Sequence, residues 1–526
     1  MEAKTTLRNL PIGIQNFEKL KEGNYLYVDK TELIYKLVSS GCYYFLSRPR
    51  RFGKSLLMST IHSYFSGRKD LFEGLAIEKL EKEWLEHPVL HLDLNTNNYD
   101  TAEVLVKKLD EALNQWEIRY ECPRTDLTLG MRFENVIRKA FEKTGRKVVI
   151  LVDEYDKPML QAIGNPELQD AYRATLKGFY GALKSMDGCI KFALLTGVTK
   201  FGKVSVFSDL NNLKDISMDE RYTGICGITE QELLSNFDGY IERLASNNHM
   251  SKDEAIATLR EQYDGYHFCE NTEGIYNPFS LFNALDSLKL RDYWFETGTP
   301  TYLVQLLQEH NYNLEKMSRE ETSADVLNSI DANSTNPIPV IYQSGYLTIK
   351  DYDPVFETYT LGFPNREVEK GFMNFLVPYY TSIPSSSSAF EIKSFVRDVQ
   401  SGNTEGFVKR LKSFFADIPY DLIKDTENHY QNVVFIIFKL MGFYTRAEYR
   451  TSEGRIDMVV KTPKFCYVLE FKLDGTAEEA LAQISDKNYT LPFAVEDQQI
   501  IRIGINFDSA TRNIDKVLVG SQLDIC

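Results

Sequence analysis

The stretch Tyr43-Tyr-Phe-Leu-Ser-Arg-Pro-Arg-Arg-Phe-Gly-Lys-Ser55 decides the fold of the first half of the chain. Its apolar start, 43–46, predicts a buried strand, and the amphipathic run 56–65 that follows it predicts a helix. A loop between a strand and a helix that ends in Gly53, Lys54 and Ser55 is typical of a phosphate-binding loop, whose backbone N–H groups hold phosphate. Lys54 would reach the outer phosphates, and Ser55 would ligate Mg²⁺.

This loop departs from the general pattern G-x-x-x-x-G-K-[ST], because Arg48 stands where the first glycine would be. A glycine there allows unusual backbone angles, so Arg48 and Pro49 predict a loop of different shape. We expect Arg48, Arg50, Arg51 and Phe52 to add contacts to the nucleotide. The alternative is a helix N-terminus that happens to contain Gly-Lys-Ser.

A second predicted strand ends in two carboxylates. The run Val148–Val152 is apolar throughout and is followed by Asp153 and Glu154, which predicts a buried strand with acids at its carboxyl end. Asp153 would hold Mg²⁺ through water, and Glu154 would polarise the water that attacks ATP. A strand ending in Asp-Glu is often only a solvated turn, but the phosphate-binding loop upstream favours the catalytic interpretation.

Two further apolar runs, Val89–Leu94 and Phe192–Leu195, predict strands, and the second of them ends at Thr196. Thr196 would either sense the outermost phosphate or make an ordinary hydrogen bond at the strand end. Arg173 and Arg221 are candidates for an arginine that stabilises phosphate charge in the transition state, although most lone arginines are surface charges.

These signals divide the chain into three parts. Alternation of strands and helices predicts an α/β domain with the parallel sheet of a P-loop NTPase over residues 1–235. Residues 236–384 predict a helical lid followed by a mixed middle lobe, and residues 385–526 predict a second α/β domain. The serine-rich stretch 382–389 has the composition of a linker or loop.

The C-terminal part carries a second set of polar residues at a characteristic spacing. Asp457 lies where a turn enters one strand, and Glu470 and Lys472 lie in the next strand, 465–472. The period of two places Glu470 and Lys472 on one face. If the strands form a hairpin, Asp457 lies beside Glu470, and the pair would hold Mg²⁺ with Lys472 next to the attacking water. This arrangement, Asp-x₁₂-Glu-x-Lys, is that of a PD-(D/E)XK restriction-endonuclease-like site.

Helices on both sides of these strands supply further candidates. Upstream, Glu427 would complete the metal site. Downstream, Gln483 and Lys487 lie one helical turn apart and suit a phosphate or the attacking water. For Glu470 and Lys472 alone, an exposed ion pair on a strand is the more common explanation, but the order helix, strand, strand, helix favours a nuclease core.

The composition limits the partners of the protein. The 526 residues include 60 Lys and Arg against 75 Asp and Glu, a formal net charge of −15. This charge excludes a protein whose whole surface is basic and binds nucleic acid without local sites. Residues 421–526 are also acidic, with 12 Lys and Arg against 16 Asp and Glu. Local cationic groups and bound Mg²⁺ would have to meet the phosphates of a substrate.

The seven cysteines are scattered without a CxxC pair, which predicts a reducing compartment and neither a zinc ribbon nor a disulfide framework. The N-terminus lacks the apolar core of a signal peptide, and the longest apolar runs are too short to cross a membrane. We therefore expect a cytoplasmic protein without a membrane partner.

The chain resembles a group of bacterial proteins, abundant in Bacteroidetes, that join an AAA-ATPase-like domain to a C-terminal PD-(D/E)XK nuclease domain. The resemblance covers nearly the whole chain and lies in the segments 27–31, 47–55, 152–156, 196–198, 208–215, 276–280, 294–299, 454–457, 470–472 and 483–484. It implies a P-loop ATPase that uses ATP and Mg²⁺, or Mn²⁺, with Lys54, Ser55, Asp153 and Glu154 in the usual roles. It also implies a nuclease site at Asp457, Glu470 and Lys472, and Arg48 is usual in this group.

Three functions remain open at this point. The leading one is an ATP-driven or ATP-gated nuclease that cleaves phosphodiester bonds in nucleic acid, DNA rather than RNA, in defence or in a mobile element. The alternative is a nucleotide-dependent switch or scaffold whose nuclease-like domain binds nucleic acid or a partner protein without cutting. An ATPase that assembles into oligomers is a third function.

Overall fold

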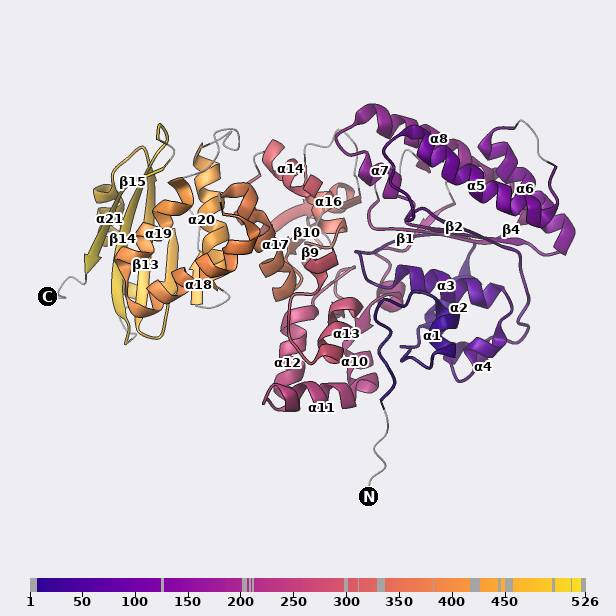
Figure 1. Ribbon diagram of the computed structural model, residues 1–526, viewed down its shortest axis with the longest axis horizontal. Helices are drawn as coiled ribbons and strands as arrows, with labels where there is room; N and C mark the ends of the chain where they lie inside the picture. The colour runs from indigo at the N-terminus through magenta and orange to yellow at the C-terminus, as the bar shows by residue number, and fades with distance from the viewer. Residues whose placement is uncertain are drawn as a thin grey trace, which may run out of the picture. The chain divides into compact units, whose positions relative to one another are not determined.

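The protein divides into two compact units (Figure 1). The computed structural model describes residues 7–123, 127–200, 206–207, 210, 212–297, 301–310, 312–328, 336–381, 383–416, 426–442, 446–449, 457–493, 497–511 and 513–521. Unit 1 consists of residues 1–297 and 320–367, and unit 2 of residues 298–319 and 368–526. The middle region 236–384 thus contributes to both units, and its separation as a lobe of its own stays a prediction.

Unit 1 is built on a parallel sheet whose strand order is β2-β3-β4-β1-β5. The strands are β1 (Tyr43–Ser47), β2 (Val89–Asp93), β3 (Val148–Asp153), β4 (Ile190–Gly197) and β5 (Lys214–Asp215). The first four are the strands that the apolar runs predict, and β1 and β3 are buried along their whole length. Because β4 lies between β1 and β3, the end of β4 separates the phosphate-binding loop from the two carboxylates.

Helices cover both faces of this sheet (Figure 1). On one face lie α1 (Phe17–Glu22), α2 (Thr31–Ser40), α3 (Lys54–Phe65) and α4 (Ala76–Leu80). On the other face lie α5 (Ala102–Tyr120), α6 (Leu129–Thr144), α7 (Lys157–Gln161) and α8 (Pro166–Ser185). Short 3₁₀ helices span Lys69–Phe72, Asp187–Cys189 and Glu220–Ile225. The predicted α/β architecture of this part is therefore confirmed.

A group of helices follows the sheet and holds the start of the chain. It consists of α10 (Glu230–Asn236), α11 (Asp238–Asn247), α12 (Lys252–Tyr263) and α13 (Pro278–Ser287), with β6 (Ile228–Thr229) paired to β7 (Ile275–Tyr276). Capping boxes begin α10 and α12, through Thr229 with Glu232 and Ser251 with Glu254. Leu10 and Val28 belong to the hydrophobic cluster of these helices, so the N-terminal segment is fixed beside α13.

The remainder of unit 1 is a small mixed region. A three-stranded antiparallel sheet has the order β8-β10-β9, formed by β8 (Glu320–Ser323), β9 (Thr348–Asp353) and β10 (Thr358–Gly362). Beside it in sequence lie a 3₁₀ helix (Trp294–Thr297), α15 (Ala324–Asn328) and α16 (Ile338–Gln343).

A buried carboxylate connects this region to the phosphate-binding loop. Glu367, at the start of α17 (Arg366–Tyr380), accepts a hydrogen bond from the backbone N–H of Trp294 at 2.8 Å. The indole Nε1 of Trp294 in turn donates to the carbonyl oxygen of Arg50 at 3.3 Å. Burial raises the pKa of Glu367 from 4.5 to about 7. The contact that holds the loop from behind therefore includes a group that titrates near neutral pH.

Glu367→Gln is expected to remove one source of pH dependence from the stability of unit 1. Because the folded-state pKa of Glu367 lies above its ordinary value, the stability that this group contributes is complete below about pH 4.5 and is lost as the pH rises through about 7. The loss amounts to about 3 kcal/mol. Denaturant unfolding from pH 5 to 8 should show the wild type losing this free energy relative to the Gln variant. The exposed Glu273→Gln is the control, and parallel profiles for Glu367→Gln and the wild type would contradict the assignment.

Unit 2 contains a second sheet, which is mixed. Its order is β11-β12-β13-β14-β15, with β13 and β14 parallel and the other pairs antiparallel. The strands are β11 (Arg446–Tyr449), β12 (Met458–Lys461), β13 (Phe465–Leu473), β14 (Gln499–Asp508) and β15 (Asn513–Ser521). The helices are α14 (Thr301–Glu309), most of α17, α18 (Ser385–Ser401), α19 (Thr404–Ala416), α20 (Thr426–Gly442) and α21 (Ala477–Asp486), with 3₁₀ helices at Leu314–Ser318 and Leu491–Phe493.

The serine-rich stretch does not form only a linker, because Ser385 begins α18. Serine has a modest helix propensity. The helix nevertheless buries Phe395 against two phenylalanines of α19, Phe407 and Phe414. Packing of this aromatic face outweighs the weak preference of the serines.

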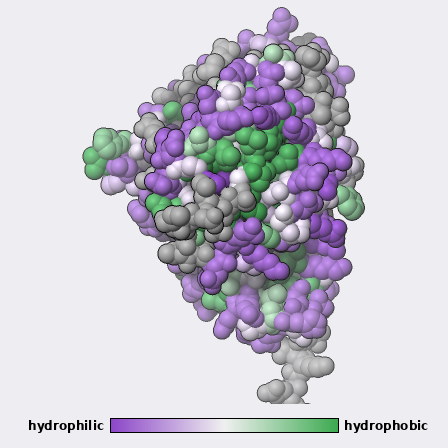
Figure 2. All heavy atoms as spheres, turned by 90° about the vertical axis from the view of Figure 1, so that its left-hand side faces the viewer, coloured by the Kyte–Doolittle hydropathy of each residue, from purple (hydrophilic) through white to green (hydrophobic). Residues whose placement is uncertain are grey.

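Most of the face of the molecule drawn in Figure 2 is hydrophilic, with hydrophobic side chains gathered near its centre.

The two faces of the unit 2 sheet receive different helices. Val468 and Cys466 of β13 pack with Ile484 of α21, whereas Tyr467 donates a hydrogen bond to the carbonyl oxygen of Val399 in α18 at 2.8 Å. The side chains of β13 therefore alternate between the two faces, as the period of two predicts. Glu470 and Lys472 consequently lie on the α21 face.

Candidate functional site

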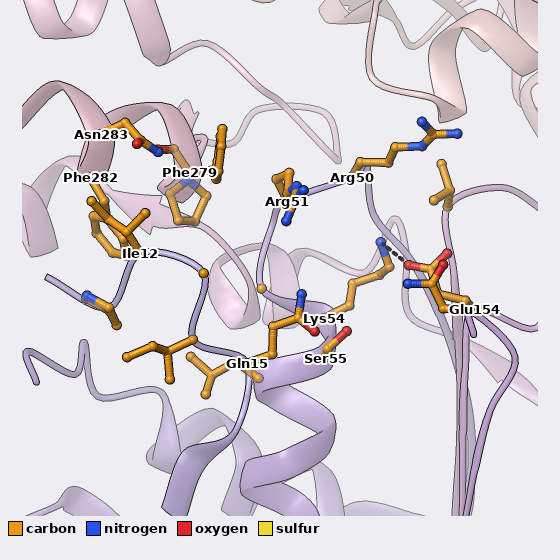
Figure 3. A pocket seen from close by; sticks show the side chains of 18 of the residues that line it. Ile12, Gln15, Arg50, Arg51, Lys54, Ser55, Glu154, Phe279, Phe282 and Asn283 are labelled. Atoms are coloured by element: carbon orange, nitrogen blue, oxygen red, sulfur yellow. Dashed lines mark hydrogen bonds and ion pairs between the residues drawn. The ribbon is translucent and has the colours of Figure 1, made fainter. Parts of the chain in front are cut away.

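A cavity of about 350 Å³ lies at the carboxyl edge of the parallel sheet in unit 1 (Figure 3). Four kinds of segment line it: the N-terminal residues 11–15, the phosphate-binding loop, the residues that follow the strands, and α13. The side chains that matter below are those of Ile12, Arg50, Arg51, Lys54, Ser55, Asn95, Glu154, Lys157, Phe279, Phe282 and Asn283. In parallel sheets, ligands bind at this edge, because the ends of several strands meet there.

The phosphate-binding loop forms one wall of the cavity at the start of α3. Positive φ angles fall at Arg51 (67°) and at Gly53 (94°), the residue that precedes the helix. The Nζ of Lys54 donates to the carbonyl oxygens of Arg48 at 3.0 Å and Pro49 at 3.2 Å. It also lies 3.4 Å from Oε1 of Glu154, as the dashed line in Figure 3 shows. Lys54 and Glu154 are therefore in direct contact at this wall of the cavity.

The other end of the cavity is apolar and aromatic. Figure 3 shows Ile12, Phe279, Phe282 and Asn283 grouped away from Lys54 and Glu154. The guanidinium carbon of Arg51 lies 5.0 Å from the centroid of the Phe279 ring, a cation–π contact between the loop and α13. The cavity thus has an apolar end and a cationic end.

Arg48 and Phe52, which the sequence analysis expects to contact the nucleotide, do not line the cavity. Arg48 is 1% exposed and its NH1 donates to the carbonyl oxygens of Ser47 at 2.9 Å and Ser217 at 2.7 Å. Its guanidinium also lies 4.0 Å from the ring centroid of Phe268. Phe52, also 1% exposed, packs edge-on against Tyr266. Both side chains anchor the loop in the core behind it.

Arg48→Ala is expected to lower the free energy of unfolding by about 3 kcal/mol, since buried carbonyl oxygens lose a charged donor and a cavity forms. Arg51→Ala, at an exposed position of the same loop, should change it by less than about 1 kcal/mol while weakening nucleotide binding. Chemical denaturation of both variants measures the difference. An unchanged stability of Arg48→Ala would show that the buried guanidinium is not an anchor.

The ends of β3 and β4 are bonded to each other behind the cavity. The hydroxyl of Thr196 donates to Oδ1 of Asp153 at 2.6 Å, and both side chains are buried and absent from the cavity lining. Asp156 accepts from the backbone N–H of Thr199 at 2.6 Å and from its hydroxyl at 2.8 Å, and burial raises the pKa of Asp156. The geometry favours the strand-end hydrogen bond for Thr196, which orients Asp153 from the side.

The two candidate arginines lie elsewhere. Arg173 pairs with Asp170 on α8, and Arg221 pairs with Asp219, and neither lines the cavity. Asn95 after β2 and Lys157 in α7 do line it, although the sequence analysis did not single them out. Asn95 follows the end of a predicted strand, so the strand-end rule that identified Glu154 would have found it.

The second candidate site is in unit 2, where the structure brings four predicted residues together. The backbone N–H of Asp457 lies 3.4 Å from Oε2 of Glu470, and Oδ2 of Asp457 accepts from the N–H of Phe471 at 2.8 Å. From α21, Gln483 accepts from Nζ of Lys472 at 2.6 Å and donates to Glu470. The Nζ of Lys472 lies 3.8 Å from Oε1 of Glu470. The predicted hairpin and the predicted common face of Glu470 and Lys472 are both present.

The electrostatics of this site fit a cation. Burial raises the pKa of Asp457, and burial followed by the Asp457 carboxylate raises the pKa of Glu470 to about 7. Two buried carboxylates side by side repel, and oxygen ligands of this kind suit Mg²⁺ or Mn²⁺. No three His, Cys, Asp or Glu side chains gather around one point among the residues that the structure describes. Glu427 lies in α20, but its side chain is outside the described residues, and Lys487 is exposed just after α21.

A third carboxylate near this site was not foreseen. Glu315 belongs to the segment 298–319 of unit 2, and burial and the charge of Asp457 raise its pKa to about 7. Asn432 of α20 holds this segment, since it accepts from the N–H of Leu314 at 2.8 Å and donates to the carbonyl oxygen of Tyr312 at 3.0 Å. More than a hundred residues separate Glu315 from Asp457 in sequence, so no local pattern connects them.

The fold and the two sites define a class: a P-loop fold of the AAA type followed by a mixed sheet of the PD-(D/E)XK type. Residues 11–207 match the family described as a predicted AAA-ATPase, and residues 425–517 match the PD-(D/E)XK nuclease superfamily. The chain belongs to the family of proteins that join a predicted AAA-ATPase domain to a C-terminal domain of the PD-(D/E)XK nuclease superfamily.

One relative matches along nearly the whole length. It is an uncharacterized protein from the vnfD 5′ region of Azotobacter chroococcum mcd 1, 36% identical over 527 residues, which covers 98% of this chain and 99% of the relative. The solved ORC2 protein of Aeropyrum pernix, in ADPNP and ADP complexes, aligns over 69% of this chain and 92% of its own at 11% identity. Its TM-score of 0.23 is too low to bear on fold or function. Among the described residues, no helix is both long and apolar enough to cross a membrane.

Proposed function

We propose that unit 1 binds and hydrolyses ATP in the cavity at the carboxyl edge of its sheet. The observation that carries this proposal is the division of one cavity into an apolar end with Phe279 and Phe282 and a cationic end with Lys54, at the start of α3. The apolar end suits a base, and the helix start with its cations suits a polyphosphate. A nucleoside triphosphate presents both chemistries in one molecule.

The residues of the cationic end take distinct roles in this proposal. Lys54 releases its ion pair with Glu154 when phosphates arrive, because the phosphate oxygens replace the carboxylate as its partner. Glu154 is then free to orient and polarise the attacking water. Mg²⁺, held by Ser55 directly and by Asp153 through water, would offset the charge of the phosphates. Thr196 keeps Asp153 oriented from the side.

Two substitutions separate binding from hydrolysis. Lys54→Ala should lower ATP affinity at least about tenfold, because a charged contact to phosphate is lost. Glu154→Gln should keep ATP affinity and lower the rate constant of hydrolysis about a hundredfold or more. Calorimetric binding and a phosphate-release assay measure the two quantities. Undiminished hydrolysis by Glu154→Gln would refute the role of Glu154.

We further propose that unit 2 cleaves phosphodiester bonds in nucleic acid, with DNA as the favoured substrate, using Mg²⁺ or Mn²⁺. The support is the shared position of Asp457, Glu470, Lys472 and Gln483 on the α21 face, together with the raised pKa of Glu470. Asp457 and Glu470 would hold the metal, Glu427 is the candidate for a further ligand, and the metal would activate water and neutralise phosphate charge. Lys472, held by Gln483, would place its ammonium at the scissile phosphate.

Glu470→Gln gives this second proposal two readouts. Without metal the variant should be at least as resistant to heat as the wild type, because removing one of two repelling carboxylates relieves the folded state. Mn²⁺ should raise the melting temperature of the wild type but not that of the variant. Cleavage of a mixed DNA and RNA panel should disappear as well. Glu478→Gln, an exposed carboxylate of α21, is the matched control.

A metal response without cleavage of any nucleic acid would favour the alternative, a nucleotide-dependent scaffold whose nuclease-like domain binds without cutting. The acidic balance of residues 421–526 is the observation behind that alternative.

We propose that ATP gates the second site, a coupling that Lys54→Ala would abolish, and that the protein works in the cytoplasm. Among the described residues no disulfide joins two cysteines, which fits a reducing compartment.

A further inference from the structure

Lys157 is a cation of the cavity that the roles proposed above do not use. It is the first residue of α7, half-buried, and lines the cavity together with Leu160. Lys157 and Leu160 lie three residues apart and so share one face of the helix, which is the face toward the cavity. Its ammonium makes no hydrogen bond or ion pair with the residues that the structure describes. This ammonium at the cavity wall is therefore available to pair with a ligand anion.

The position of Lys157 along the cavity follows from its connection to Glu154. The backbone N–H of Lys157 donates to the carbonyl oxygen of Glu154 at 3.0 Å, so one tight turn separates the two residues. Figure 3 shows Glu154 at the end of the cavity remote from Phe279 and Phe282. Lys157 therefore belongs to the end where the outermost phosphate of a bound nucleotide would lie.

Lys157 approaches this end from a different side than the other cations. Arg50, Arg51 and Lys54 all belong to the phosphate-binding loop. Arg51 is stacked over Phe279 near the apolar end, and Lys54 is in contact with Glu154. Lys157 comes from α7, beyond the end of β3, so a terminal phosphate would lie between the loop and α7.

We propose that Lys157 is a catalytic residue that contacts the terminal phosphate of ATP and stabilises the charge that develops there during hydrolysis. The inference rests on the proposed ATPase function and deepens it: the stabilising cation comes from the same chain, in the role for which Arg173 and Arg221 were candidates. ADP lacks the phosphate that Lys157 would contact. Lys157 therefore discriminates the triphosphate from the diphosphate, and each chain hydrolyses ATP without a residue from a second copy.

The test compares full-length wild type with Lys157→Gln and Lys157→Arg. We expect Lys157→Gln to weaken binding of the non-hydrolysable β,γ-imido analogue of ATP about tenfold, to leave ADP binding within about twofold, and to lower the rate constant of hydrolysis. Lys157→Arg keeps the charge and should restore most of the preference for the triphosphate. The exposed Lys184→Gln on α8 is the control for loss of a lysine charge.

Several outcomes would overturn the proposal. An unchanged ratio of analogue to ADP affinity with an unchanged hydrolysis rate would show that Lys157 does not contact the phosphate. Equal loss of both affinities with a lower melting temperature would show a structural role only. A rate per chain that rises with protein concentration would place the cation on a second copy. Failure of the ATPase proposal itself is distinguishable, because the wild type would then bind neither nucleotide.

Discussion

The burial of the Arg48 guanidinium is the contact on which the proposed nucleotide site depends. Arg48 occupies the position where a phosphate-binding loop usually has a glycine, and its side chain turns away from the cavity into the core. There it donates to backbone carbonyl oxygens and lies against Phe268. A buried arginine keeps its charge, so it must be surrounded by acceptors and an aromatic face to be tolerated. These contacts hold the loop at its first residue. The positive φ angles of the loop lie further along, at Arg51 and Gly53.

The loop is also held from the side and from across the sheet edge. Trp294 donates to the carbonyl oxygen of Arg50 and is itself fixed by the buried Glu367. The turns after β3 and β4 are bonded together through Asp153, Thr196, Asp156 and Thr199. These contacts fix the backbone around the cavity while leaving Lys54, Glu154 and Lys157 at its surface. A rigid support with a few polar groups exposed to the ligand is the usual requirement of a site for charge-stabilised chemistry.

In unit 2, too, a fixed backbone and hydrogen bonds hold the polar side chains of the candidate site. Alternation along β13 aims Glu470 and Lys472 at α21, and Gln483 bridges them. The hairpin of β12 and β13 then brings Asp457 to Glu470. Burial and, after it, the neighbouring Asp457 carboxylate raise the pKa of Glu470, so a bound cation would stabilise the charged form of this pair. The carboxylates of the two candidate sites thus account for part of the acidic composition of the chain.

The sequence by itself determined the strands β1 to β4, the places of Lys54, Ser55, Asp153 and Glu154 at the helix start and the strand end, and the common face of Glu470 and Lys472. Each of these depends on local spacing, because a period of two or 3.6 and the edge rule for parallel strands need only neighbouring residues. Only the tertiary structure decided that Arg48 and Phe52 are anchors, that Phe279 and Ile12 close the cavity, and that Lys157 and Glu315 lie near the two sites. These positions result from contacts between segments far apart in sequence. Whether a side chain points to the core or to the cavity depends on which distant acceptors it finds, which no local pattern encodes.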